Sequence, residues 1–432
     1  MTGHLLVRSA TGPIDASVDV PGSKSIANRA LVCAALADGE SVIEGVPMGD
    51  DTAALVECLG VLGVAVSIAA GRAIVDGHGG TLLPGPAMLP ARLAGTTSRF
   101  VTALAALGRG PYVVDGDQPL RARPMGPLHD ALVELGAAVR PLESAGHLPV
   151  EIAGPAAGGR VAVSGDVSSQ FVTALMLIGP YLRGGLRIDL TSPLVSRPYV
   201  AMTATVMEAF GCGRVGVTDD SIAVEEARYA PTTYRVEPDA TSAGYPLAVA
   251  AVAGGTVVVD GLRRTSLQGD SRFADLLESM GCRVEWRADG VAVTRDPARL
   301  LVGVDVDMAD MSDLVPTLAV VAAIASTRTR IRGVGFIRGK ESDRLGDLAA
   351  ELAKTGADVE VEADGLLIDP APRTMHGARL ATHHDHRLAM AFGVLGTVVG
   401  GVEVEDPSVV TKSWPDYWEM LERITRPPGT SG

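Results

Sequence analysis

The stretch DALVELGAAV at residues 130–139 decides the fold, because near copies of it recur along the chain. In each copy an apolar helical segment ends at a glycine, and a valine follows within four residues. This pattern is typical of a helix with a glycine C-cap that leads into a strand. The copies are spaced 70 to 75 residues apart, and their glycines are Gly63, Gly136, Gly211, Gly281 and Gly356.

A second pattern recurs at the same interval. Strand-like segments such as GESVIEG, GPYVVDG and GTVVVDG are rich in β-branched residues. These segments end at Gly45, Gly116, Thr191, Gly261, Gly333 and Pro407. Because 432 residues divide into six intervals of about 72, the chain is predicted to consist of six similar units.

Each unit has the same expected order of elements. A polar cluster opens an apolar helix, a strand follows, and then a second, amphipathic helix precedes further strands. Units of this size are too large for a helical solenoid. We therefore predict an α/β protein with helices inside, sheets outside, and three units in each of two domains.

The composition excludes several classes of protein. The net charge is −14, so a general nucleic-acid binder is not expected. Four separated cysteines argue against a disulfide scaffold, and we find neither a signal peptide nor an apolar run of membrane-spanning length. We expect a soluble, cytoplasmic protein that does not contact membranes.

Lysine is scarce in this chain. Only four of its 37 basic residues are lysines, namely Lys24, Lys340, Lys354 and Lys412. One explanation is that the chain retains lysine where a compact, movable ammonium is needed. The alternative is that the scarcity reflects codon bias and chance.

Cations gather at the expected helix starts. A helix N-terminus favours anions, and several such ends with nearby cations would bind several anionic groups at once. The alternative is that the polar residues at these starts are only N-caps. The cations are Lys24, Arg29, Arg123, Lys340, Arg344, Arg387 and Lys412.

Other local signals are weak. The PGSKS segment lacks the spacing of a nucleotide-binding P-loop, and no GxSxG elbow is present. His383, His384 and His386 beside Asp385 lack a second ligand cluster, so we expect no metal and no cofactor.

Eight segments carry a family resemblance. They are PGSKSIANR, LAGTTSRF, RARPMGPL, SGDVSSQF, LVSRPYV, IRGKESDRL, DHRLAMAFG and TKSWPDY. In this order and spacing the chain, from about residue 15 onward, resembles the 5-enolpyruvylshikimate-3-phosphate synthases. The resemblance implies two inside-out α/β domains, 21–237 and 1–20 plus 238–432, joined by two crossovers and drawn together by substrates.

The resemblance also implies an activity. Family members transfer the enolpyruvyl group of phosphoenolpyruvate to the 5-hydroxyl of shikimate 3-phosphate, release phosphate, and are targets of glyphosate. We accordingly expect a monomer whose partners are these small molecules.

Site residues follow from matched positions. Asp313 resembles the base for the hydroxyl and Glu341 the acid for the methylene carbon, with its proton arriving with the substrate or through Lys24. Matches to shikimate 3-phosphate contacts are Lys24, Ser25, Arg29, Ser168, Ser169, Gln170, Ser196, Asp313 and Lys340. Matches to phosphoenolpyruvate contacts are Lys24, Gly95, Arg123, Gln170, Arg344, Arg387 and Lys412.

Three positions depart from the family pattern. Leu93 and Phe100 flank the GTTSR segment, and Phe336 stands where an asparagine is frequent. They put one substrate hydrogen bond and the shape of the phosphoenolpyruvate pocket in question.

Two other functions stay open from the sequence. One is a UDP-N-acetylglucosamine enolpyruvyl transferase, although this chain has KS where that family has KN and lacks a cysteine near RARPMG. The other is a non-catalytic anion-binding repeat protein, which the two carboxylates Asp313 and Glu341 argue against.

Overall fold

The computed structural model describes residues 3–426. In that part of the chain the strands form six small sheets, five with four strands and one with three. The chain divides into two compact units. The N-terminal unit is Gly22–Glu237, and the C-terminal unit comprises Met1–Pro21 and Pro238–Gly432.

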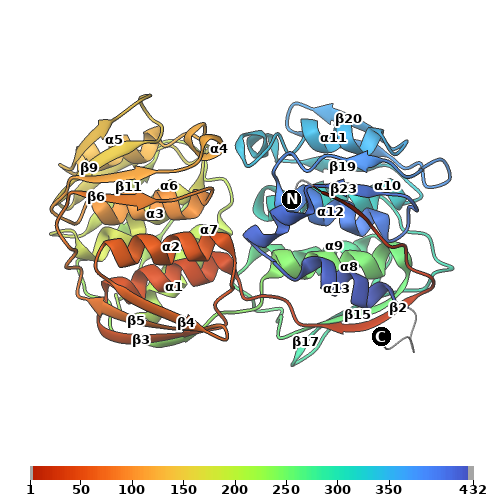
Figure 1. Ribbon diagram of the computed structural model, residues 1–432, viewed down its shortest axis with the longest axis horizontal. Helices are drawn as coiled ribbons and strands as arrows, with labels where there is room; N and C mark the ends of the chain where they lie inside the picture. Colours follow the sequence, from red (N-terminus) through yellow and green to blue (C-terminus); the bar gives the residue numbers. More distant parts are fainter. Residues whose placement is uncertain (1–2, 427–432) are drawn as a thin grey trace. The chain divides into compact units, whose positions relative to one another are not determined.

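The N-terminal unit contains three of the sheets (Figure 1), with strand orders β14-β3-β5-β4, β6-β7-β9-β8 and β10-β11-β13-β12. Its strands are β3 (Asp38–Glu44), β4 (Ala65–Ala69), β5 (Arg72–His78), β6 (Ala87–Pro90), β7 (Tyr112–Asp115), β8 (Ala138–Pro141), β9 (Val150–Ala153), β10 (Gly159–Val163), β11 (Leu186–Leu190), β12 (Gly216–Val217), β13 (Ser221–Val224) and β14 (Thr233–Arg235). Its helices are α1 (Lys24–Leu36), α2 (Asp50–Val61), α3 (Gly95–Ala105), α4 (Gln118–Arg121), α5 (Gly126–Glu134), α6 (Ser169–Ile178), the 3-10 helix η1 (Gly179–Tyr181) and α7 (Pro198–Ala209).

The C-terminal unit contains the other three sheets, with orders β16-β17-β15-β2, β18-β19-β21-β20 and β1-β23-β22. Its strands are β1 (His4–Leu6), β2 (Ile14–Val18), β15 (Gly255–Asp260), β16 (Arg283–Trp286), β17 (Gly290–Arg295), β18 (Asp305–Asp307), β19 (Thr329–Arg332), β20 (Asp358–Glu362), β21 (Gly365–Asp369), β22 (Arg379–Leu380) and β23 (Glu403–Glu405). Its helices are α8 (Ala240–Ala253), α9 (Phe273–Ser279), α10 (Val315–Ile324), α11 (Gly346–Ala353), α12 (His386–Gly396) and α13 (Tyr417–Thr425), with 3-10 helices η2 (Gly269–Arg272), η3 (Ala309–Leu314), η4 (Gly335–Gly339) and η5 (Pro407–Lys412).

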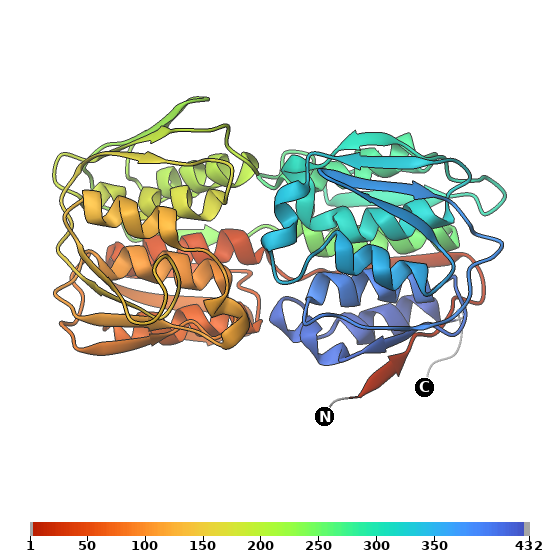
Figure 2. The same ribbon diagram turned by 90° about the horizontal axis from the view of Figure 1, so that it is seen from above.

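Each of the six repeated sequence segments contributes one apolar helix to the core of the compact unit in which it lies (Figure 2). In the N-terminal unit α1, α3 and α6 pack against one another, and in the C-terminal unit α8, α10 and α12 do the same. Nearly every residue of these six helices is buried, which is the behaviour of helices that are apolar all round. The strands lie outside these helices, so the prediction of an inside-out α/β architecture is confirmed.

The five repeated glycines end their helices as predicted. Their φ values lie between 80° and 104°, in the left-handed region. At Gly136 no other atom lies within 4 Å of the position that a Cβ would occupy, so backbone conformation, and not space, favours glycine there.

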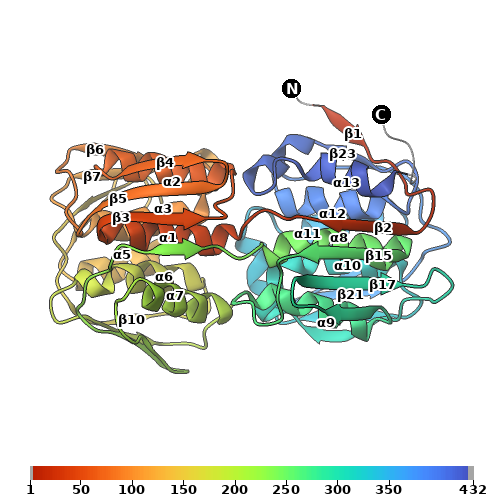
Figure 3. The same ribbon diagram turned by 90° about the horizontal axis from the view of Figure 1, so that it is seen from below.

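Strands from distant parts of the chain close each unit. In the N-terminal unit β14 pairs in parallel with β3. In the C-terminal unit β2 pairs in parallel with β15 (Figure 3), and β1 pairs antiparallel with β23. The first 18 residues therefore complete two sheets of the C-terminal unit.

None of the helices in residues 3–426 combines the length and the apolar composition needed to cross a bilayer.

Candidate active site

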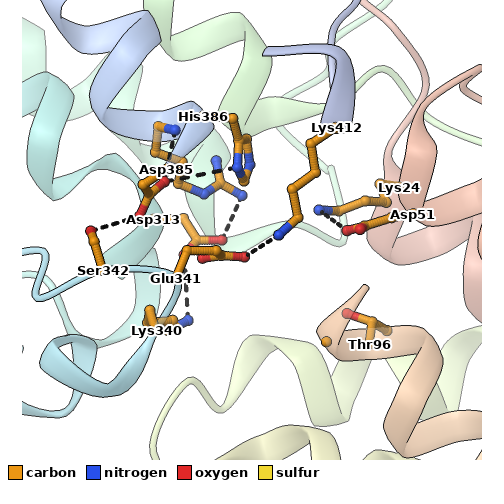
Figure 4. Close-up of polar contacts among 12 residues, drawn as sticks. Lys24, Asp51, Thr96, Asp313, Lys340, Glu341, Ser342, Asp385, His386 and Lys412 are labelled. Carbon is orange, nitrogen blue, oxygen red and sulfur yellow. Dashed lines mark hydrogen bonds and ion pairs between the residues drawn. The ribbon is translucent and has the colours of Figure 1, made fainter. Parts of the chain in front are cut away.

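Arg344 is the centre of a buried charge cluster in the C-terminal unit. Figure 4 shows the three acids of this cluster, Asp313, Glu341 and Asp385. The Arg344 side chain is 1% exposed and donates hydrogen bonds to three carboxylates. Nη1 donates to Asp313 Oδ1 at 2.8 Å, Nε donates to Asp385 Oδ2 at 2.7 Å, and Nη2 donates to Glu341 Oε2. The planar guanidinium can serve three acceptors at once, which an ammonium cannot do in the same geometry.

Further cations surround the same carboxylates. Lys412 Nζ donates to Glu341 Oε1 at 3.0 Å. Asp313 lies 2.7 Å from Arg387 Nη2 and 3.4 Å from Lys340 Nζ. Together with Arg344, four formal positive charges face the three carboxylates, so the cluster keeps an attraction for anions.

The charges in the cluster determine the protonation state of Asp313. Burial by itself raises the pKa of this carboxyl. Three nearby cations override burial and hold the pKa well below its usual range: Arg387, Lys340 and Arg344. Asp313 is therefore an ionised carboxylate, and as such it accepts protons.

The pKa of Lys340 is also lowered, which for a lysine disfavours the charged form. Burial lowers the pKa of its ammonium, and the negative charge of Asp313 opposes that effect only in part. A lysine of this kind loses a proton more readily than an exposed one.

The backbone of this cluster differs from the sequence prediction, which placed its residues at helix starts. α11 begins only at Gly346, so Glu341 and Arg344 lie in the loop after η4. Lys412 is the last residue of η5 and does not begin a helix.

The loop after η4 is fixed by side chains: Ser342 Oγ donates to Asp385 Oδ2 at 3.1 Å. Asp385 in turn caps α12, since its carboxylate accepts from the Arg387 backbone N–H at 2.9 Å.

In the N-terminal unit, Lys24 is the first residue of α1. Its ammonium forms a 2.8 Å ion pair with Asp51, which lies in the first turn of α2 and is 3% exposed. Lys24 is thus already paired with a buried carboxylate.

Arg29 is buried within the helical core of the N-terminal unit. Its guanidinium donates to Thr203 Oγ1 at 2.7 Å and to the Ser25 carbonyl at 2.7 Å. The guanidinium carbon lies 5.6 Å from the centroid of the Phe100 ring and 5.7 Å from that of Tyr199. Burial lowers the pKa of Arg29 to about 10.

Gly95 and Arg123 lie in direct contact. Gly95 begins α3, and a methyl group built on it would overlap the Arg123 guanidinium, with Cζ 2.9 Å away. The absence of a side chain at Gly95 therefore lets Arg123 lie against the start of this helix.

Gln170 connects two of the buried helices. It lies in the first turn of α6, and its Nε2 donates to Thr96 Oγ1 at 3.3 Å on α3. Among the described residues its buried Oε1 has no hydrogen-bond partner, so this acceptor is available to a donor such as a substrate hydroxyl or a cation.

The three predicted serine contacts have distinct environments. Ser168 caps α6, because its hydroxyl accepts from the Gln170 backbone N–H at 3.2 Å. Ser169 is the buried first residue of that helix. Ser196 is buried with φ of 55°, a conformation that costs energy in a residue with a side chain.

The three departures from the family pattern fall in different environments. Phe100 is buried beneath Arg29. Phe336 lies 5.8 Å from the Lys340 ammonium, so an aromatic ring supports this cation from one side. Leu93 is partly exposed.

Sequence reasoning missed the buried counterions. Asp385 and Asp51 are the buried partners of Arg344 and Lys24, and neither was assigned a role. Two neutral groups were missed as well: Thr96 accepts from Gln170, and Ser342 donates to Asp385. The signals for the two acids were present in the segments DHR and DD, where an acidic residue precedes or begins a helix.

No group of three or more histidine, cysteine or acidic side chains in residues 3–426 is arranged to hold a metal ion. The four cysteines are free and buried.

Known proteins resemble this chain over nearly its full length. The family model for EPSP synthase (3-phosphoshikimate 1-carboxyvinyltransferase) matches residues 9–421. A 3-phosphoshikimate 1-carboxyvinyltransferase of Methanospirillum hungatei is 41% identical over 417 residues, 96% of each chain. One of Methanoculleus marisnigri is 43% identical over 420 residues, which cover 96% of this chain and 99% of that protein.

Solved structures show the same fold. The 2.37 Å structure of EPSP synthase from Acinetobacter baumannii superposes with a TM-score of 0.82, covers 98% of both chains, and has 24% sequence identity. Because the family model spans most of the residues and these relatives match end to end, the chain belongs to the EPSP synthase (3-phosphoshikimate 1-carboxyvinyltransferase) family.

Proposed function

We propose that this chain transfers the enolpyruvyl group of phosphoenolpyruvate to the 5-hydroxyl of shikimate 3-phosphate and releases phosphate. The observation that carries the proposal is the cluster around Arg344, in which Asp313 and Glu341 are embedded among cations. Both substrates are polyanions, so cations are needed for binding, and the transfer needs proton-handling groups within the same site.

The reaction needs three proton movements. The methylene carbon of phosphoenolpyruvate gains a proton and becomes a methyl group, while the hydroxyl oxygen bonds to the central carbon and the hydroxyl proton departs. When the carbon–oxygen bond to phosphate then breaks, the methyl carbon loses a proton, which restores the methylene of the transferred group. We assign the removal of the hydroxyl proton to Asp313 and the protonation of the methylene carbon to Glu341. Asp313 is ionised before the substrate arrives, so it can accept the hydroxyl proton, but the cations that keep it ionised also make it a weak base.

The binding roles are proposed by matched position. For phosphoenolpyruvate we propose Lys24, Gly95, Arg123, Gln170, Arg344, Arg387 and Lys412. For shikimate 3-phosphate we propose Lys24, Ser25, Arg29, Ser168, Ser169, Gln170, Ser196, Asp313 and Lys340. Arginine forks fit carboxylate and phosphate oxygens, and serine hydroxyls at a helix start add neutral donors.

The two compact units are proposed to be the two catalytic domains. We propose further that the enzyme acts as a cytoplasmic monomer without a metal or a cofactor. Light scattering behind gel filtration should then give the mass of one chain, 44.5 kDa. A mass of two or more chains would contradict the monomer.

Phosphate release tests the function directly. With phosphoenolpyruvate present, shikimate 3-phosphate should give phosphate in EDTA, and UDP-N-acetylglucosamine should not. Release only with the nucleotide sugar would identify the other enolpyruvyl transferase, release with neither would favour the non-catalytic anion binder, and rescue by a divalent ion would contradict metal independence.

Two variants test the proton roles. Asp313→Asn and Glu341→Gln preserve size, and each should lower kcat by about 10²- to 10⁴-fold with modest changes in KM. A raised KM with unchanged kcat would mean that the carboxylate only holds its neighbouring cations in place.

A further inference from the structure

Asp270 is a buried acid in the C-terminal unit that has no role in the proposed reaction. It lies in η2, which packs against α8 and against η3, the segment that contains Asp313. The residue is only 5% exposed. Its Oδ2 accepts a hydrogen bond from the Thr241 hydroxyl, and in residues 3–426 its buried Oδ1 has no hydrogen-bond partner.

The segment that carries Asp270 is fixed on both sides. Gln268 accepts from the Ala240 backbone N–H at 2.9 Å and donates to the Pro238 carbonyl at 2.7 Å, which ties η2 to the start of α8. Arg272 Nη2 lies 3.2 Å from Asp310 Oδ2, which ties η2 to η3. These contacts fix the segment that carries Asp270 against α8 and against η3, which carries Asp313.

Three charged groups act on this carboxyl from the packed elements. Asp313 faces it from η3, Arg387 from the start of α12, and Asp239 from the cap of α8. Burial first, and the negative charge of Asp313 second, raise the pKa of Asp270 to about 7. The Thr241 hydrogen bond and Arg387 oppose this rise, and Asp239 adds to it.

We propose that Asp270 is a positioning residue for Asp313: its buried carboxyl changes charge in response to Asp313 and sets how strongly Asp313 attracts the substrate hydroxyl proton. The inference rests on the proposed role of Asp313 as the base. Two like charges in a shared buried environment disfavour each other, so an ionised Asp270 makes protonation of Asp313 more favourable.

The cluster gives this influence a chemical purpose. Three cations keep Asp313 ionised, but the same cations make it a weak base. An ionised Asp270 on the neighbouring segment counteracts these cations and makes Asp313 more basic. In this proposal Asp270 acts through Asp313 and transfers no proton to the substrate.

The first test is the pH profile of kcat with shikimate 3-phosphate and phosphoenolpyruvate. For the unaltered enzyme we expect kcat to rise through pH 7 as Asp270 ionises. Asp270→Asn keeps the shape of the neutral acid, so the rise should disappear, and kcat at pH 8 should fall by roughly threefold to tenfold. A rise that persists unchanged in this variant would overturn the proposal.

Thr241→Val provides an independent variant. The Thr241 hydroxyl lowers the pKa of Asp270, so removal of this hydroxyl should move the rise in kcat to higher pH. Ser271→Ala is the matched control, because it removes a buried hydroxyl bonded to the Gln268 carbonyl without changing the charge on Asp270. Its profile should coincide with that of the unaltered enzyme, and an equal shift in all three variants would indicate a merely structural effect.

A stability measurement separates this inference from the proposed function. The folded pKa of Asp270 is above its unfolded value, so stability is lost as pH rises from about 4 towards 7. The urea midpoint of Asp270→Asn relative to the unaltered protein should therefore move upward between pH 5 and pH 8. If the difference in urea midpoint between the two proteins is the same at both pH values, Asp270 does not change charge and the inference is refuted, whatever the activity. If the difference changes with pH but Asp313→Asn remains active, only the role of Asp313 as the base is refuted.

Discussion

Arg344→Lys isolates the contribution of the guanidinium to the charge cluster. The substitution keeps one positive charge but replaces a planar fork by a compact ammonium. In the structure Arg344 serves Asp313, Glu341 and Asp385, and it is 1% exposed. A lysine in its place would leave at least one buried carboxylate without its cation.

The size of the effect follows from burial. Leaving one partner of a buried ion pair uncompensated costs about 3–5 kcal/mol of unfolding free energy. Arg328→Lys is the matched control, because Arg328 makes two 2.8 Å contacts to Asp369 with 61% and 40% of these side chains exposed. Loss of such an exposed pair costs little stability, because solvent screens its charges.

Tryptophan fluorescence provides the assay. Trp286, Trp414 and Trp418 are the tryptophans of the chain, and all three belong to the C-terminal unit. A urea titration followed by this signal therefore reports the unit that contains both Arg344 and Arg328. If Arg344→Lys lost no more stability than Arg328→Lys, the guanidinium would not hold the three carboxylates, and the account of the cluster would be wrong.

Two further predictions concern the N-terminal unit. Gly95→Ala should displace the Arg123 guanidinium and raise both the KM for phosphoenolpyruvate and the inhibition constant of glyphosate. Gly60→Ala is the control, because the space around its Cβ position is open, and it should leave both constants unchanged. An unaltered KM in Gly95→Ala would refute the contact between Gly95 and Arg123. Burial lowers the pKa of His129 to about 4, so stability should fall as pH drops below 6.5, by up to roughly 3 kcal/mol. Circular dichroism in urea should show that His129→Gln removes this loss, and an equal pH dependence in both proteins would contradict it.

The repeated sequence patterns were sufficient to predict the sheets and the buried helices. Glycine C-caps and apolar helices are local features, and five such glycines and six such helices set the architecture without knowledge of distant contacts. Strand β1 could not be predicted in this way. His4–Leu6 is only three residues long, and its pairing with β23 depends on the far end of the chain.

The charged residues of the candidate site were less predictable than the fold. The cations at Arg344 and Lys412 were evident from their clustering in an acidic chain, but the loop that carries Glu341 and Arg344 was not. That loop is held by side-chain contacts with Asp385, which come from 41 residues further along the chain. Local sequence patterns carry no information about such contacts.

The carboxylates that hold the cations explain how an acidic protein can keep a buried site for anions. An arginine as buried as Arg344 would be costly without counterions, so Asp313, Glu341 and Asp385 stabilise it before any substrate binds. Acids of this kind also compete with an incoming anion for the same donors. Asp385, which is fully buried, serves to stabilise Arg344, whereas Asp313 and Glu341 also weaken anion binding unless they act on the substrate. The paired carboxylates therefore favour catalysis over simple anion capture, and they do so on grounds of charge alone.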